Sequence, residues 1–370
     1  MTEISLTMFI LDAHCDSPSQ MYRLRDFQND NDHAQVDFPK LRAGGIGASV
    51  FAMYIFPQLE GAEATAYALK LMAGVYDQVE REGGDFRICC NASQLRENIA
   101  SRRVSILMSL ENGSPIQRSL SLLRLFRRMG ISSIVLTHNA DNEIGDAAAG
   151  SRRWGGLSPF GREVVSEMNR LGMIVDVSHA SDETASDCLD CSKAPIIASH
   201  SSCRSINPLR RNISDSLMRR ISDGGGLVGI SLYPSFLSAE FAGLLAADGL
   251  EDRVDAIEEE FKADPADPGR IAAWHAAQDS LLTLPRPSYK AVVDHIEHAV
   301  NVAGIDHVGI GSDYDGVCVQ PVGLENVSKL PCIFEELHSR GYSWDDCEKV
   351  AGGNYLRVLS EVESLAEPSM

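Results

Sequence analysis

Histidines and carboxylates stand directly after short apolar runs at several places in this sequence. The run "MFILDAH" leads to His14 and Asp16, and alternate residues of an extended strand point to the same side. Imidazole nitrogens and carboxylate oxygens bind divalent metals. Later runs of strand length end in or near similar groups: Glu111, His138, His179, His200, Tyr233 and Asp313. Because four of the ten histidines fall at these ends, we predict a metal site rather than a scatter of solvated side chains.

Eight apolar runs alternate with amphipathic stretches, and this alternation predicts the fold. The runs are 8–14, 46–54, 104–111, 132–138, 173–179, 195–200, 226–233 and 307–313. Between them lie helical patterns such as "FGREVVSEMNRLG", whose apolar face runs from Phe160 to Leu171 and stops at Gly172. Continuously apolar strands favour a parallel sheet buried on both faces, so we predict an α/β fold, a (β/α)8 TIM-type barrel. Functional groups of such a barrel gather at the C-terminal strand ends; the second run, ending near Met53 and Tyr54, offers neither acid nor imidazole there.

Two segments exceed what a bare barrel needs. Residues 238–287, rich in Ala, Asp, Glu and Pro, are too long for a simple loop between strands seven and eight, so we expect extra helices near the barrel mouth. After the eighth strand, residues 321–370 predict a C-terminal helical segment. No solenoid repeat, low-complexity tract or clear linker divides the chain, and we expect residues 1–370 to form a single hydrolase domain.

Composition argues against several classes of partner. A formal net charge of −19 repels nucleic acid and anionic membranes, so we expect neither as a partner. The first residues, "MTEISLTMFILD", lack the features of a signal peptide, and the nine cysteines fit a reducing compartment. We therefore expect a cytoplasmic protein. Cys188 and Cys191 have the spacing of a metal knuckle but no partner pair, which favours a structural role.

The number of candidate ligands constrains the metal chemistry. His14, Asp16, Glu111, His179 and His200 are too many for one open catalytic zinc and too few for two closed sites. If Glu111 bridges two ions, each has three protein ligands and a hydroxide can complete the bridge. We therefore predict two Zn²⁺ per chain, a pair that produces a nucleophile at neutral pH and polarises a carbonyl or phosphoryl oxygen.

Long motifs that can be compared with known families occur in order over nearly the whole chain. They are "DAHCD", "SLENG", "LTHNADNEIGD", "FGREVVSEMNRLGMIVDVSH", "ASHSS…RRN", "VGIGSDYDG", "GLENVSKLP" and "GGNYLRVL". Together they resemble the membrane (renal) dipeptidase family, a binuclear zinc branch of the amidohydrolase-type barrels. The sequence departs from the family at Cys15, where Asn is usual, and in the insertion after strand seven.

The resemblance implies a role for each candidate residue. It implies that His14, Asp16 and Glu111 bind one zinc ion, and that the second is bound by Glu111, His179 and His200. It further implies that His138 contacts the substrate carbonyl and that Arg211 pairs with the dipeptide carboxylate. Asp313 would handle the proton of the bridging water, and Tyr233 would add a substrate contact. The implied activity is zinc-dependent hydrolysis of dipeptides, L-L or L-D, by a metal-bridging hydroxide.

Other functions stay open on the sequence alone. The same ligands could serve a phosphoesterase, a lactonase or a deaminase, although no phosphate-binding glycine loop is evident. A non-catalytic scaffold would be expected to have lost ligands, and all five are present. Arg210 and Arg211 could also be a solvated basic pair before a helix that begins near Ser214. The preferred dipeptide and a possible homodimer are not decided by these patterns.

Overall fold

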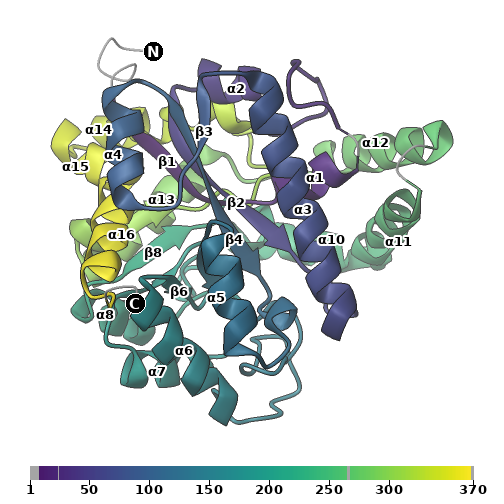
Figure 1. Cartoon of the computed structure of the whole chain (residues 1–370). Helices are drawn as coiled ribbons and strands as arrows, with labels where there is room; N and C mark the ends of the chain where they lie inside the picture. Colours follow the sequence, from purple (N-terminus) through teal and green to yellow (C-terminus); the bar gives the residue numbers. More distant parts are fainter. Residues whose placement is uncertain (1–7, 24, 265–266, 368–370) are drawn as a thin grey trace.

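The chain folds into a barrel of parallel strands surrounded by helices (Figure 1). The structure, a computed structural model, describes residues 8–23, 25–264 and 267–367. Within these ranges the barrel consists of β1 (Ile10–Cys15), β2 (Ile46–Tyr54), β4 (Val104–Glu111), β5 (Ile131–Val135), β6 (Ile174–Asp176), β7 (Ile196–Ala198), β8 (Leu227–Ile230) and β9 (Val308–Ile310). The predicted (β/α)8 barrel is confirmed.

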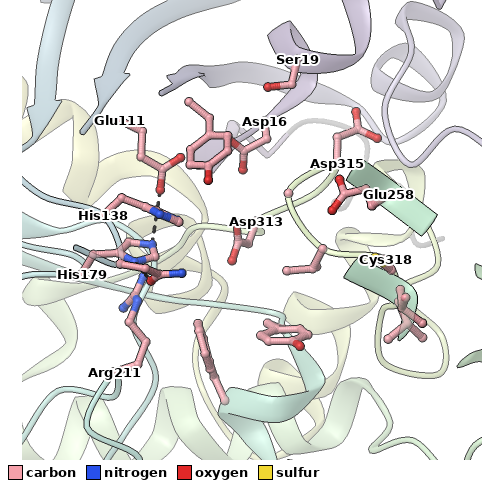
Figure 2. A pocket seen from close by; sticks show the side chains of 18 of the residues that line it. Asp16, Ser19, Glu111, His138, His179, Arg211, Glu258, Asp313, Asp315 and Cys318 are labelled. Carbon is pink, nitrogen blue, oxygen red and sulfur yellow. Dashed lines mark hydrogen bonds and ion pairs between the residues drawn. The ribbon is translucent and has the colours of Figure 1, made fainter. Parts of the chain in front are cut away.

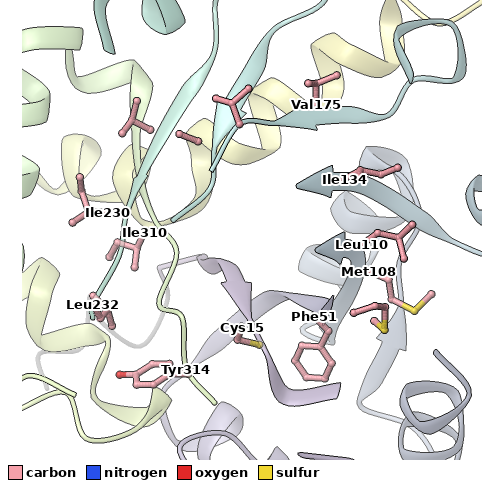
Figure 3. Packing of buried hydrophobic residues seen from close by; sticks show 14 of the residues in the cluster. Cys15, Phe51, Met108, Leu110, Ile134, Val175, Ile230, Leu232, Ile310 and Tyr314 are labelled. Atoms are coloured by element: carbon pink, nitrogen blue, oxygen red, sulfur yellow. The ribbon is translucent and has the colours of Figure 1, made fainter. Parts of the chain in front are cut away.

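Parallel pairing runs around the barrel in the order β1-β2-β4-β5-β6-β7-β8-β9. The circle closes where Cys15 and Tyr314 form a parallel bridge and the Asp16 N–H donates to the Tyr314 carbonyl at 2.8 Å. Buried side chains such as Phe51, Leu110 and Ile310 belong to one large cluster that joins the strands to the surrounding helices (Figure 3). Burial of the strands on both faces explains why their sequences are continuously apolar.

Helices surround the barrel, and local sequence signals mark the ends of some of them. They are α1 (Ser17–Tyr22), α2 (Phe38–Ala43), α3 (Gly61–Glu82), α4 (Ala92–Ala100), α5 (Leu120–Arg128), α6 (Pro159–Leu171), α7 (Asp182–Cys191), α8 (Asp215–Asp223), α13 (Tyr289–Ala303) and α14 (Pro331–Ser339). In α6, the Ser158 hydroxyl accepts the Gly161 N–H at 2.9 Å, and Gly172 ends the helix with φ of 65°.

The long segment after β8 forms four helices, as predicted. They are α9 (Pro234–Leu237), α10 (Ala239–Ala246), α11 (Leu250–Ala263) and α12 (Pro268–Leu282), and α11 and α12 project to one side of the barrel (Figure 1). A small apolar cluster of their own, separate from the barrel cluster, contains Phe241, Leu245, Val254, Phe261, Trp274, Leu281 and, from the loop after β9, Val319.

The C-terminal segment is also helical. It comprises α15 (Trp344–Glu348), a π-helical turn (Lys349–Gly353) and α16 (Asn354–Ser364). Tyr355 and Val358 of α16 pack with Leu11 and Ile174 of the barrel strands. This helix therefore covers an apolar surface that the strands themselves present.

Two details differ from the sequence-based expectation. An additional short strand, β3 (Phe86–Ile88), pairs in parallel with the first residues of β4, a pairing too short to leave an apolar periodicity. Several barrel strands also end earlier than predicted; β6 stops at Asp176, three residues before His179. The chain leaves the sheet there and turns into the barrel mouth.

Other expectations can be compared directly with the fold. All nine cysteines are free thiols. Cys188 and Cys191 lie on α7, and no cysteine of the described residues belongs to a group that could hold a metal ion. No helix within the described ranges is long and apolar enough to cross a membrane.

Candidate metal centre and cavity

A cavity of about 450 Å³ opens at the C-terminal ends of the barrel strands (Figure 2). Its wall contains most of the predicted site residues: Asp16, Glu111, His138, His179, Arg211, Tyr233 and Asp313. The two others, His14 and His200, are buried beside it with 1% and 0% of their surface exposed. The structure thus brings together residues that are up to 299 positions apart in the sequence, from His14 to Asp313.

Glu111, the last residue of β4, lies at the centre of the charged groups. Its Oε2 is 3.5 Å from His14 Nε2, and its Oε1 is 3.3 Å from His179 Nε2. His200 Nε2 also lies 3.5 Å from Oε1, and Asp16 Oδ2 lies 3.6 Å from His14 Nε2. The two carboxylate oxygens of Glu111 therefore face two different sets of ligand atoms, which is the arrangement that a bridging carboxylate requires.

Hydrogen bonds on the far side of two imidazole rings orient their free nitrogens toward the centre. His179 Nδ1 lies 3.1 Å from the Oδ1 acceptor of Asn139, which favours the tautomer whose Nε2 has a free lone pair. His200 Nδ1 lies 2.9 Å from the Ser199 hydroxyl. The two Nε2 atoms are only 3.0 Å apart. Two nitrogen atoms facing each other so closely are well placed to share a cation.

Burial and charge shift the protonation of the candidate ligands in different directions. Burial lowers the pKa of His179 and His200 well below the ordinary value, and nearby cationic groups add to the effect, so both rings are neutral. Burial raises the pKa of Asp16 to about 7, and the Glu111 carboxylate adds to the shift. Burial opposes protonation of His14, yet Glu111 and Asp16 raise its pKa well above the ordinary value. Carboxylates crowded in this way are stabilised by positive charge.

Unsatisfied polar atoms in the same place support a metal site. Neither ring nitrogen of His14, nor Oδ1 of Asp16, has a hydrogen-bond partner among the described residues, although all three atoms are buried. Such atoms are costly to bury unless a ligand completes them. Neutral imidazoles and carboxylates are also the donor set that Zn²⁺ prefers, so these residues fit divalent metal.

Unusual backbone conformations turn two of the side chains into the cavity. His179 and Asp313 adopt φ of 65° and 63°, in the left-handed region that non-glycine residues rarely occupy. Gly316 permits a close approach nearby, since a Cβ atom there would lie 2.2 Å from Asp16 Oδ2 and 2.7 Å from Asp313 Oδ1. A side chain at position 316 would therefore displace both carboxylates.

A buried aspartate ties the end of β1 to the end of β9. Asp12 accepts the Ser312 N–H at 2.8 Å and the Ser312 hydroxyl at 2.6 Å. The Asp313 N–H then donates to the His14 carbonyl at 3.0 Å. These bonds fix the position of His14 relative to Asp313.

Asp313 and His138 lie close to the ligand atoms. His14, His200 and Asp313 each offer an atom within 4.8 Å of the others, and Glu111, His138 and His179 form a similar group. Burial raises the pKa of Asp313 to about 6, with Asp16 as the largest charge contribution. Asp313 is therefore a carboxylate able to exchange a proton close to neutral pH.

Arg211 presents a positive charge to the cavity. Its Nη1 donates to the Ser201 hydroxyl and its Nη2 to the His200 carbonyl, both at 2.8 Å. Burial lowers its pKa to about 10, opposed first by the Asp313 carboxylate, so the guanidinium remains charged at neutral pH. No carboxylate of the described residues lies within 4.0 Å of it, and its buried Nε has no hydrogen-bond partner. Arg210, by contrast, is exposed, so the two arginines are not a solvated pair.

Three further residues belong to this site but were not singled out from the sequence. Tyr54, at the end of β2, lines the cavity, and its ring centre is 4.7 Å from that of His138. Asn139 orients His179, and the ring of Phe236 lies 5.1 Å beneath the Arg211 guanidinium. The sequence offers one signal for Asn139, which directly follows His138. It offers none for Phe236, because the contact of Phe236 with Arg211 depends on the fold.

Comparison with known proteins identifies relatives along the whole chain. A model of the membrane dipeptidase family, peptidase family M19, matches residues 1–370. The chain is 33% identical over 358 residues to the dipeptidase aclJ of Aspergillus oryzae, covering 94% of this chain and 75% of that protein. It is 31% identical over 371 residues to the dipeptidase tcpJ of Claviceps purpurea, covering 96% and 77% of the two chains.

Solved structures show the same fold. The probable dipeptidase PvdM from Pseudomonas aeruginosa superposes with a TM-score of 0.82 at 27% identity, covering 98% of both chains. A metallopeptidase from Rhodobacter sphaeroides, solved with a phosphinate mimic of the dipeptide L-Ala-D-Ala, superposes with a TM-score of 0.78 at 23% identity. That alignment covers 96% of this chain and 99% of the other.

Proposed function

The chain belongs to the membrane dipeptidase family, peptidase family M19, and from this premise we propose how its cavity carries out the reaction of a metallo-dipeptidase. The proposed substrate is a dipeptide with a free carboxylate. The observation that carries the proposal is the position of Arg211, a charged donor without an acidic partner among the described residues, in the same cavity as Glu111 and its surrounding histidines. In this proposal, residues 1–370 act as a single hydrolase domain.

The metal ligands follow from the contacts of Glu111. His14, Asp16 and Glu111 would hold one ion, and Glu111, His179 and His200 would hold a second. Zinc is the proposed metal, because neutral imidazoles with few carboxylates form an open zinc site. Two divalent ions bound in this way lower the pKa of water and polarise a peptide carbonyl.

Arg211 holds the free carboxylate of the substrate. A guanidinium presents two parallel donors that match a carboxylate, and the donors of Arg211 now bond only to neutral oxygens. Phe236 packs against the guanidinium and limits its movement. Fixing this end of the dipeptide places the peptide bond beside Glu111 and His138.

The remaining groups stabilise charge and move a proton. His138 donates a hydrogen bond to the carbonyl oxygen as negative charge develops on it. The Asp313 carboxylate accepts a proton from the attacking water and transfers it to the amide nitrogen, which then leaves as an amine. Tyr233 adds a contact to the substrate from the cavity wall. No side chain forms a covalent bond to the substrate.

Four measurements of kcat/KM test the role of Arg211. Wild-type enzyme and Arg211→Ala are each assayed on a dipeptide and on its C-terminally amidated form, in L-L and L-D series. Loss of either partner removes the same charge-assisted contact, so each single change should lower kcat/KM by roughly 30- to 1,000-fold, on the order of 2–4 kcal/mol.

The combined change decides the interpretation. It should cost little more than either change alone, because the contact is already lost. Strictly additive losses would show that Arg211 and the carboxylate do not meet. A wild-type enzyme indifferent to amidation would contradict the proposed dipeptide substrate.

A further inference from the structure

The catalytic cavity has an apolar end that the proposed chemistry does not use. We propose that this end is the binding subsite for the side chain of the substrate's N-terminal residue, and that it selects large apolar side chains such as those of Leu, Met and Phe. The inference rests on the proposed function and specifies its substrate class. The wall of this subsite is formed by Leu245, Val254 and Leu281 from the insertion, together with Val319.

These four residues form a packed surface. Leu245, Val254, Leu281 and Val319 are 4%, 5%, 3% and 2% exposed, and all belong to the apolar cluster of the insertion. Phe261 and Trp274 of the same cluster stack on each other with ring centres 6.0 Å apart. Helices α10, α11 and α12 each contribute one of these side chains, and their burial in one cluster makes the wall a formed subsite before substrate binds.

The direction of the substrate follows from Arg211. Figure 2 shows Arg211 on one side of the cavity and Glu258 and Cys318 on the other, with Asp16 and Asp313 between them. A dipeptide whose carboxylate meets Arg211 has its peptide bond beside the metal ligands. Its N-terminal residue then extends toward the insertion, where the apolar wall lies.

The charges at this end are already paired. Among the described residues of the insertion, Glu258 is the charged one that lines the cavity. Its Oε1 lies 3.5 Å from Arg23 Nη1. Arg23 and Asp315 line the cavity as well, and Asp315 is paired with Arg25. A charged substrate side chain would therefore be buried against Leu and Val without a counter-ion of its own, which is unfavourable.

Two series of dipeptides separate the ends of the substrate. In the Xaa-Gly series, kcat/KM for Leu-Gly and Phe-Gly should exceed that for Ala-Gly by about 10- to 100-fold, since several buried methylene groups are added. Asp-Gly should be the poorest substrate. In the Gly-Xaa series the dependence on apolar size should be much weaker, because that side chain lies on the Arg211 side.

Two neighbouring leucines supply a matched pair of variants. Leu281 is 3% exposed and lines the cavity, whereas Leu282 is 45% exposed. Leu281→Trp fills the subsite and should lower the Leu-Gly to Ala-Gly ratio of kcat/KM by about 10-fold or more. Leu282→Trp should leave this ratio at the wild-type value. Leu281→Ala enlarges the subsite without overpacking and should shift the preference from Leu-Gly toward Phe-Gly.

The outcomes distinguish this inference from the proposed function. Hydrolysis of dipeptides with no dependence on the N-terminal side chain, or ratios unchanged by both Leu281 variants, would overturn the subsite but leave the dipeptidase in place. Absence of hydrolysis across both series in the metal-loaded enzyme would instead contradict the proposed function. A preference carried by the Gly-Xaa series would reverse the assigned direction of the substrate.

Discussion

The two ends of the catalytic cavity are built by different kinds of structure. At the metal end, strand termini and tight loops hold buried polar groups, and Glu111 and His200 are 3% and 0% exposed. At the other end, helices of the insertion present apolar side chains that cluster with Phe261 and Trp274. The metal end has many fixed hydrogen bonds, while the apolar end depends on shape and burial.

This difference suggests how the molecule divides its tasks. Catalysis needs groups fixed within a fraction of an ångström, and the hydrogen-bonded barrel supplies that precision through pairs such as Asp12 with Ser312. Selection of a side chain needs only a surface of suitable size. An insertion between two strands can change that surface without moving the proposed metal ligands.

The largest expected effect separates proton transfer from metal binding within the metal end. Asp313→Asn keeps the shape of the side chain but removes the proton acceptor, so kcat should fall by about 10²- to 10⁴-fold. Metal content per chain should stay near the wild-type value. If the variant loses metal in parallel with activity, Asp313 belongs among the ligands, in keeping with its proximity to His14 and His200.

A smaller effect is expected at His295, which joins the barrel to the insertion. Its Nδ1 accepts the Cys203 N–H at 2.9 Å, and its Nε2 lies 3.2 Å from the Leu237 carbonyl. Burial lowers its pKa from 6.5 to about 4. As pH falls, the unfolded chain therefore takes up this proton first. This proton uptake leaves the free energy of unfolding unchanged above about pH 6.5 and lowers it progressively between pH 6.5 and 4.

Urea unfolding at pH 7 and pH 5 measures this contribution. His295→Gln should reduce the acid-induced loss in the free energy of unfolding by about 2 kcal/mol relative to wild type. The control is His298→Gln on the same helix, where the ring contacts Asp215 at 2.9 Å and is partly exposed. An identical pH dependence in wild type and His295→Gln would show that His295 is not held neutral at this junction.

Much of the barrel could be predicted because its signal is local. The bounds of β2 and β4 match the predicted runs, since each is a continuous apolar segment buried on both faces. The early ends of β6 and β9 were not visible, because the left-handed conformations of His179 and Asp313 depend on contacts made in the folded state. The three-residue strand β3 was too short to produce a recognisable pattern.

The candidate site was predictable in its residue types and less so in its supports. The structure brings the nine predicted residues together, while their individual roles stay predictions. The supporting role of Asp12 leaves no signal in the sequence, because its partner, Ser312, is 300 positions away. Tyr54 and Phe236 act through ring contacts with His138 and Arg211, and such contacts leave no trace in spacing along the chain.

Metal content per chain tests the central claim, that Glu111 joins two metal ions in one catalytic site. Elemental analysis of zinc-replete protein should find two ions in the wild type. Glu111→Gln should weaken both ions together, because the shared charge is lost, whereas His179→Ala should leave one ion bound. A wild type with a single ion, or a Glu111→Gln variant that loses only one of two, would contradict the account.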